Sequence, residues 1–123
     1  MGHEFEATSG RVIGAAIEVH RTRGPGYLES TYQKALRVAL DHRGISYLTE
    51  PLVSVSFEGE EVGRGRLDFV VEQQLVVELK AVAALHPIHF AQLRSYLKAT
   101  GLHSGLLLNF NAPKLEIRRM VEG

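Results

Sequence analysis

The chain has 123 residues, of which 45% are apolar, so it can fill one hydrophobic core, and we expect a single domain over residues 1–123. It contains no cysteine, which excludes disulfides, thiolate nucleophiles and cysteine–zinc sites. Its 14 Lys and Arg balance its 14 Asp and Glu, which argues against strong autonomous binding of nucleic acid, because contacts with many phosphates usually require a basic excess.

Two amphipathic helices are predicted in the first third of the chain. The first covers about residues 9–20, where apolar residues recur at helical spacing, and Thr8 or Ser9 can cap its start. The Gly-Pro-Gly sequence at 24–26 breaks the chain. The second helix follows over about 28–43, and Gly44 stands at the position of a C-terminal cap.

From residue 45 the apolar pattern alternates, which is typical of strands. Strands are predicted at 52–57, 66–71 and 75–80, with a turn at 58–60. The strand at 75–80 is almost wholly apolar before Glu78, as expected for a central strand covered on both faces.

The last part of the chain predicts a helix at about 88–100 and a strand at 104–110. The tail after Pro113 is ambiguous between a strand and a short helix. The connection from Lys80 through this helix to Leu106 has the length of a parallel crossover. The element order therefore predicts an α/β sandwich around a mixed sheet, with a three-strand meander of antiparallel pairs before the crossover.

Three polar residues stand out on the predicted strands. Glu78 and Lys80 are two apart, so they share one face of their strand, with Leu79 on the other. A short turn can bring Asp68 beside Glu78, and two adjacent carboxylates repel unless a cation such as Mg²⁺ lies between them. A lysine beside such a pair can orient a water molecule or stabilise charge on a phosphate. The spacing is that of a metal-assisted phosphodiester hydrolase.

The alternative is that these residues are solvated charges or a surface ion pair of little energetic value. Glu78 and Lys80 follow an apolar stretch that reads as buried, where an unpaired charge is costly. This context favours a site.

A wider set of residues resembles one protein family. Gly26, Glu29 and Tyr32 form the pattern GxxExxY, the signature of the GxxExxY protein family, which is part of the PD-(D/E)XK nuclease superfamily. The similarity extends along nearly the whole chain, at Glu18-Val19-His20, Gly24-Pro25-Gly26, Arg66, Asp68, Glu78-Leu79-Lys80-Ala81-Val82, His89, Ala91-Gln92, Tyr96-Leu97 and Asn109-Phe110. One departure is Arg23, where the family usually has an aliphatic residue.

The resemblance implies a restriction-endonuclease-like α/β sandwich, with a central mixed β-sheet flanked by helices, and a role for each matching residue. Asp68 and Glu78 match the metal-binding carboxylates and Lys80 the catalytic lysine. Glu29 matches an acidic residue on an early helix near the metal. Gln92 and Tyr96 match the QxxxY pattern of the exonuclease-like branch, whose helix contributes to the site or touches DNA.

Structural explanations stand beside these roles. Glu29 lies in the first turn of its helix, where the helix dipole alone favours a carboxylate. Gln92 and Tyr96 are four apart, as on any amphipathic helix, and Tyr32 fits the core. Both readings stay open at these positions.

The remaining candidates are histidines and one arginine. His86 and His89 are three apart, but a zinc site needs at least one further ligand. His89 is instead a candidate substrate contact. Arg66, two before Asp68 on the predicted strand, can steady a carboxylate or a phosphate.

The first functional hypothesis is a nuclease that uses Mg²⁺ or Mn²⁺ to cleave DNA or RNA. The second is a non-catalytic module on the same scaffold that binds nucleic acid or protein, since fold does not fix function. The third is hydrolysis of a smaller phosphate ester. The sequence has no apolar run of about 18 residues and no secretion signal, so we expect a cytoplasmic protein without a membrane partner. Whether it forms a homodimer is left open.

Overall fold

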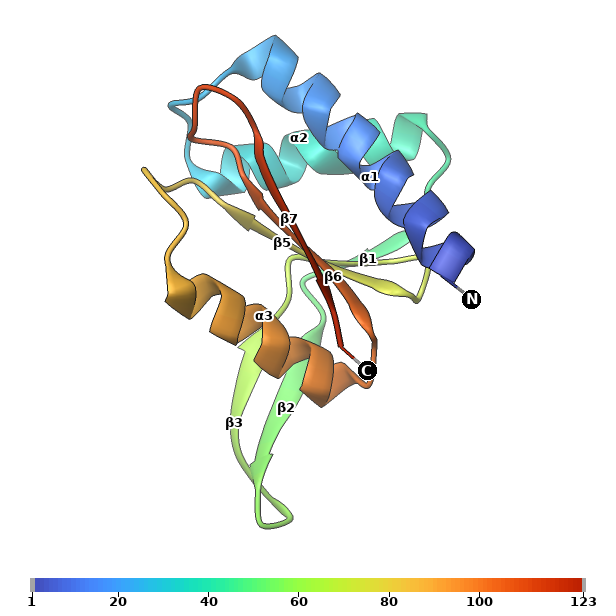
Figure 1. The fold of residues 1–123 in the computed structure, drawn as a ribbon, viewed down its shortest axis with the longest axis vertical. Coiled ribbons are helices and arrows are strands. Elements are labelled where there is room, and N and C mark those ends of the chain that lie inside the picture. The colour runs from blue at the N-terminus through green and yellow to red at the C-terminus, as the bar shows by residue number, and fades with distance from the viewer. Residues whose placement is uncertain (1, 123) are drawn as a thin grey trace.

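The computed structural model describes the backbone of residues 2–122 and the side chains of residues 7–122. The elements in chain order are α1 (Gly2–Arg23), α2 (Glu29–His42), β1 (Tyr47–Thr49), β2 (Leu52–Phe57), β3 (Glu60–Arg66), β4 (Phe69–Val71), β5 (Leu75–Lys80), α3 (Pro87–Thr100), β6 (Ser104–Asn109) and β7 (Glu116–Val121). Five strands form one sheet in the order β1-β4-β5-β6-β7, and β2 and β3 form a separate pair. The fold is the predicted restriction-endonuclease-like arrangement of a mixed sheet flanked by helices (Figure 1).

The centre of the sheet is the parallel pair β5 and β6, and the other neighbours are antiparallel. Helix α3 connects β5 to β6, so the predicted parallel crossover is confirmed. Such a connection must cover one face of the sheet. Helices α1 and α2 lie together on the opposite face (Figure 1).

The alternation of side chains along β5 divides the core in two. Leu75, Val77 and Leu79 pack with α1 and α2, while Val76 packs with α3. Every residue of the strand from Leu75 to Leu79 is buried. The prediction of a central strand covered on both faces is confirmed, and Leu79 points away from the α3 face as expected.

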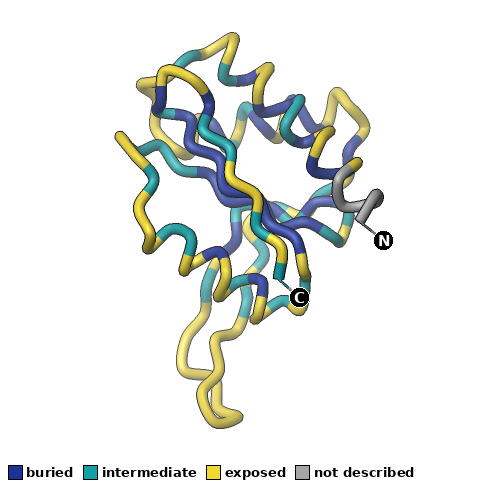
Figure 2. The backbone as a smooth tube through the Cα atoms, in the orientation of Figure 1, coloured by how far each residue is buried: buried dark blue, intermediate teal, exposed yellow. Residues whose placement is uncertain are grey.

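The β2–β3 pair is a hairpin that projects from the body of the protein (Figures 1 and 2). Its turn is made by Glu58 and Gly59, both with positive φ, which suits a two-residue hairpin connection. The predicted meander is wrong here, because β2 pairs only with β3 and the strand that meets β5 is β4. The predicted strand at 66–71 is also wrong: it is divided between β3 and β4, and Leu67 and Asp68 form a bend between them.

Other local predictions fare differently. Helix α2 has the expected buried stripe, and Gly44 follows its end with φ of 67°. Thr8 and Ser9 do not cap α1: they are buried within it, because the helix begins earlier. The ambiguous tail is strand β7, and β1 is a strand that the pattern did not reveal. Over the part of the chain that the structure describes, no helix is both long and apolar enough to cross a membrane.

Candidate functional site

The Asp68 and Glu78 side chains meet where the β4–β5 ladder ends. That ladder runs only to the pair Phe69 and Val77. Beyond it, Glu78 Oε1 accepts the Asp68 backbone N–H at 2.8 Å, and Asp68 Oδ2 accepts the Leu79 backbone N–H at 2.7 Å. Each carboxylate thus replaces a missing backbone partner on the other strand, and this reciprocal clasp fixes the two side chains next to each other.

Burial makes both carboxylates weak acids. Glu78 is only 5% exposed. Burial, and then the charge of Asp68, raise the pKa of Glu78 to about 8. Burial likewise raises the pKa of Asp68 to about 6, although the Leu79 N–H and the Lys80 charge act in the opposite direction. Two carboxylates held together in a low-dielectric environment hold protons tightly until a cation replaces them.

One oxygen of each carboxylate remains available. Among the described residues, none donates a hydrogen bond to Asp68 Oδ1 or Glu78 Oε2, and none forms an ion pair with either group. No buried side-chain oxygen in the described chain lacks a partner, so these two oxygens reach solvent. They can therefore serve as ligands.

Lys80 is tied to α3 on the same face of the sheet. Its Nζ donates to Gln92 Oε1 at 3.3 Å, and Gln92 Nε2 donates to the Tyr96 hydroxyl at 3.2 Å. The charge of Lys80 acts to lower the pKa values of Asp68 and Glu78. Burial raises the pKa of Tyr96, and the charges of Glu78 and Asp68 raise it further. The structure therefore brings together five of the sequence-predicted residues: Asp68, Glu78, Lys80, Gln92 and Tyr96.

Glu29 lies near this group but not within it. It is the first residue of α2, and its charge raises the pKa of both Asp68 and Glu78. Its helix begins where the pattern predicts because Tyr32 fastens the preceding loop: the Tyr32 hydroxyl donates to Gly24 O at 2.5 Å and accepts the Tyr27 N–H at 3.2 Å. Tyr32 is also fully buried, as its core reading predicts.

The protein supplies only some of the ligands that a divalent cation needs. No group of three or more His, Cys, Asp or Glu side chains is placed to hold a metal within the described part of the chain. The carboxylate pair nevertheless has the chemistry Mg²⁺ prefers, since this ion is commonly bound by one or two carboxylates and completes its shell with water and substrate phosphate oxygens. Asp68 and Glu78 fit such a site, with Glu29 nearby.

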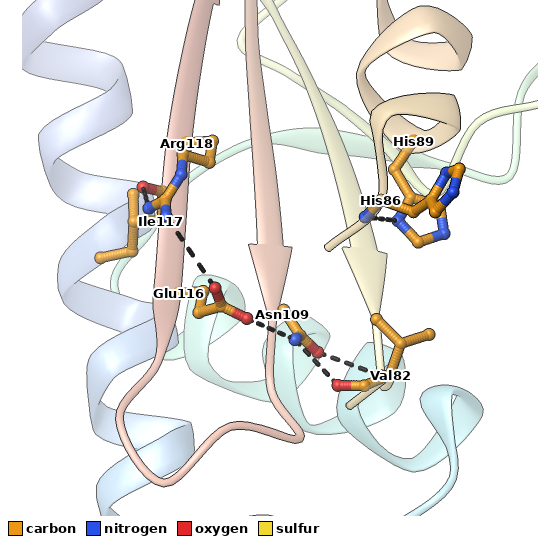
Figure 3. Close-up of polar contacts among 7 residues, drawn as sticks. All are labelled: Val82, His86, His89, Asn109, Glu116, Ile117 and Arg118. Atoms are coloured by element: carbon orange, nitrogen blue, oxygen red, sulfur yellow. Dashed lines mark hydrogen bonds and ion pairs between the residues drawn. The ribbon is translucent and has the colours of Figure 1, made fainter. Parts of the chain in front are cut away.

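The two predicted histidines form the start of α3. His86 Nδ1 accepts the Ile88 N–H at 3.1 Å. His89 Nδ1 accepts the His86 N–H at 3.0 Å (Figure 3). Their Nδ1 atoms therefore cap the helix. Burial and the charge of Lys80 lower the pKa of His89, which places this ring within electrostatic reach of the site.

Arg66 is not on the strand of Asp68. It ends β3, opposite Leu52, and its side chain is exposed. Asp68 lies beyond the end of β3, in the bend that it forms with Leu67. The prediction that Arg66 and Asp68 share one strand is therefore wrong.

Two nearby residues were not predicted as site residues. Glu50 donates its backbone N–H to Asp68 O at 3.0 Å, and its charge contributes to the raised pKa of Asp68. Asn109 is fully buried beside the end of β5. Asn109 belongs to the family resemblance and follows the apolar run at 106–108, but neither signal gave it a role, and no local pattern marks Glu50.

Comparisons with known proteins identify the family and the fold. A family model described as the PD-(D/E)XK nuclease superfamily matches residues 6–120. The crystal structure of SSO0001 is similar with a TM-score of 0.60 and 22% sequence identity, covering 76% of this chain and 49% of the other. The chain thus spans about half the length of that protein, and the likeness concerns the fold. No curated protein matches the sequence.

Proposed function

The chain belongs to the PD-(D/E)XK nuclease superfamily, and on this basis we propose that it is a metal-dependent nuclease that hydrolyses phosphodiester bonds of DNA or RNA. The observation that carries the proposal is the clasped pair of Asp68 and Glu78, with one oxygen of each open to solvent. A pair of buried carboxylates without an ion-pair partner is costly to a protein that makes no use of it.

Asp68 and Glu78 would hold Mg²⁺ or Mn²⁺ through Oδ1 and Oε2. The bound ion would lower the pKa of a water molecule and neutralise charge on the phosphate. The protein's own contribution is to keep the two carboxylates in one arrangement before the ion arrives, through their bonds to the Leu79 and Asp68 amides. Glu29 would support the ion at longer range.

Lys80 would orient the attacking water or stabilise charge on the phosphate. Its hydrogen bond to Gln92 directs the ammonium group along the face that carries Glu78. Gln92 and Tyr96 would contact the substrate from α3, His89 from the first turn of that helix, and Arg66 from the base of the hairpin. Each of these contacts belongs to the proposal.

The narrower assignment to the GxxExxY family has structural support. Gly26 has φ of 108°, a conformation that favours glycine, and Tyr32 fastens the loop before Glu29. All three signature positions thus shape the start of α2. We further propose one domain over residues 1–123 and a cytoplasmic location, and the oligomeric state is a matter for light scattering.

A second candidate is a non-catalytic module that binds nucleic acid or protein. The balanced charge of the chain favours it, because strong binding to phosphates usually needs a basic excess. The two candidates differ in what Lys80 does: only a nuclease loses its activity without that ammonium group.

The test combines metal titration by calorimetry with cleavage assays. The parent protein, the double variant Asp68→Asn with Glu78→Gln, and the hairpin control Glu61→Gln are titrated with Mn²⁺ and Mg²⁺ in the presence of nucleic acid. The substrates are single- and double-stranded DNA and RNA, with small phosphoesters as a separate arm.

We expect metal binding and cleavage in the parent and the control, and loss of both in the double variant. Nucleic-acid binding without cleavage, unchanged by Lys80→Ala, would replace the nuclease with the binding module. Absence of both metal binding and cleavage in the parent would overturn the proposal.

A further inference from the structure

Asn109 is the last residue of β6 and stands opposite Lys80 in the parallel ladder. It is polar and yet completely buried. Its Oδ1 accepts the Val82 N–H at 3.1 Å, and its Nδ2 donates to Val82 O at 2.9 Å and to Glu116 Oε1 at 2.7 Å (Figure 3). Its Oδ1 also accepts the Asn111 N–H at 3.2 Å. The proposed roles above leave this side chain unused.

The four bonds use the whole capacity of a primary amide, which has two N–H donors and two acceptor positions. An aspartate in this place would lack the donors for Val82 O and Glu116, and a leucine would lack every partner. The environment of Asn109 is therefore specific for an amide.

The bonds to Val82 continue the sheet beyond its end. The Phe110 N–H donates to Lys80 O at 2.9 Å. Val82 lies two residues after Lys80, and its N–H and C=O both form hydrogen bonds with the Asn109 side chain. The side chain thus acts as a strand partner for a segment that has left the ladder. This segment links Lys80 to α3, so the Asn109 amide holds the beginning of that connection.

A second connection meets the first through Asn111. Its N–H bonds to Asn109, and its Oδ1 accepts the Gly26 N–H at 3.0 Å. Gly26 belongs to the loop that leads into α2, three residues before Glu29. The loop that follows Lys80 and the loop that leads to Glu29 are therefore joined through the buried Asn109 amide and then the Asn111 side chain.

We propose that Asn109 is a positioning residue for the nuclease reaction: its amide holds the loop after Lys80 directly, and the loop before Glu29 through Asn111, in one arrangement around the carboxylate pair. This inference rests on the proposed function. Asn109 does not contact Asp68 or Glu78, and these two hold each other through their own backbone bonds. Loss of the amide should consequently displace Lys80 while leaving metal binding in place.

The test compares Asn109→Leu and Glu116→Ala with Ser104→Ala. Ser104 is a buried polar residue at the opposite end of β6, so it controls for general loosening of the strand. Glu116→Ala removes one of the four bonds that orient the amide, so it serves if Asn109→Leu does not fold. Cleavage is measured as kcat and KM, and Mn²⁺ affinity by calorimetry.

We expect Asn109→Leu to lower kcat about 100-fold, the effect of a misplacement near 1 Å, with KM and Mn²⁺ affinity changed less than about threefold. Glu116→Ala should lower kcat by a smaller factor, and Ser104→Ala should match the parent. An unchanged kcat in Asn109→Leu, or an equal loss in Ser104→Ala, would overturn the proposal. If Asn109→Leu does not fold, an unchanged kcat in Glu116→Ala would do so.

A readout without activity separates this proposal from the nuclease assignment. The Gln92 side-chain amide bonds to Lys80 and Tyr96, so its NMR signals report the position of Lys80. Suppose that the parent shows no cleavage, while these signals shift in the Asn109 or Glu116 variant and not in Ser104→Ala. The positioning of Lys80 by Asn109 then stands, and the nuclease proposal falls. Unshifted signals would exclude the positioning role, whatever the outcome for the nuclease proposal.

Discussion

Strands β5 and β2 differ in how far their side chains are exposed to solvent. In β5 the charged residue Glu78 is 5% exposed, whereas in β2 the aromatic residue Phe57 is 66% exposed. The two regions join at the bend of Leu67 and Asp68, which links the hairpin to the sheet. Figure 2 shows the contrast along the backbone, with the centre of the sheet buried and the hairpin largely exposed.

The difference reflects what covers each strand. Strand β5 has helices on both faces and neighbours on both edges, so every group on it loses water. The hairpin contacts the rest of the protein near Gly65 and Val53, which pack against α3. A charge in β5 therefore costs free energy that function must justify, while an apolar side chain on the hairpin gains little from its position.

The largest effect should come from removing the ammonium group on β5. Lys80→Ala should lower the cleavage rate about 10²–10³-fold, as expected for one group that stabilises transition-state charge. Arg64→Ala, which removes an exposed charge on the hairpin, should leave the rate within about twofold. Rates are measured at saturating metal. Equal losses in both variants would show that the two regions do not differ in catalysis.

Core truncation should separate the two regions in stability. Leu79 is fully buried, so Leu79→Ala should lower the free energy of unfolding by about 2–5 kcal/mol. Phe57→Ala on the hairpin should change it by less than about 0.5 kcal/mol. Urea unfolding followed by circular dichroism measures both. A large loss for Phe57→Ala would mean that the hairpin buries its apolar face against a partner in solution.

Metal should stabilise the sheet through its carboxylates. At a concentration 100 times the Kd, Mn²⁺ should raise the free energy of unfolding by about 2.7 kcal/mol. The double variant Asp68→Asn with Glu78→Gln should show no such gain, whereas Glu61→Gln should equal the parent. Thermal unfolding with and without EDTA checks this, and stabilisation retained in the double variant would place the metal elsewhere.

The metal-free protein should lose stability as pH rises. The folded pKa values of Asp68 and Glu78, about 6 and about 8, lie above their ordinary values of 3.8 and 4.5. Between about pH 4 and pH 8 these two groups therefore bind more protons in the folded chain than in the unfolded chain, and their contribution to stability falls by at most about 1.4 kcal/mol per pH unit for each group.

The double variant Asp68→Asn with Glu78→Gln should flatten this slope, and metal should stabilise the parent more as pH rises because it binds the deprotonated pair. Urea unfolding in EDTA at several pH values measures the slope. A stability that rises over this interval in the parent would contradict the assignment of both pKa values.

The smallest effect concerns the joint of hairpin and helix. A Cβ at residue 65 would lie 2.5 Å from Tyr96 Cε1, whereas a Cβ at residue 63, on the same strand, would meet nothing within 4 Å. Gly65→Ala should displace the Tyr96 ring and cost about 1 kcal/mol, while Gly63→Ala should be neutral or slightly stabilising. Urea unfolding and the NMR signals of Tyr96 compare the two. Identical behaviour would show that the hairpin does not support Tyr96.

Much of the fold follows from local patterns in the sequence. The apolar run at 75–80 predicted a central strand, and the length of the connection to 104–110 predicted its parallel partner. Period-two alternation placed Glu78 and Lys80 on one face without any knowledge of the neighbours. These features depend on residues close in sequence, so periodicity and length suffice to predict them.

Only the tertiary structure decided how distant segments meet. The bend at Asp68, the departure of the hairpin from the sheet, and the positions of Glu50 and Asn109 beside the site all depend on partners remote in sequence. An alternating segment such as 52–57 satisfies the strand pattern in either sheet, because the pattern specifies a face and not a neighbour. The sequence alone indicated the residues on which the proposed chemistry depends, and long-range pairing decided what surrounds them.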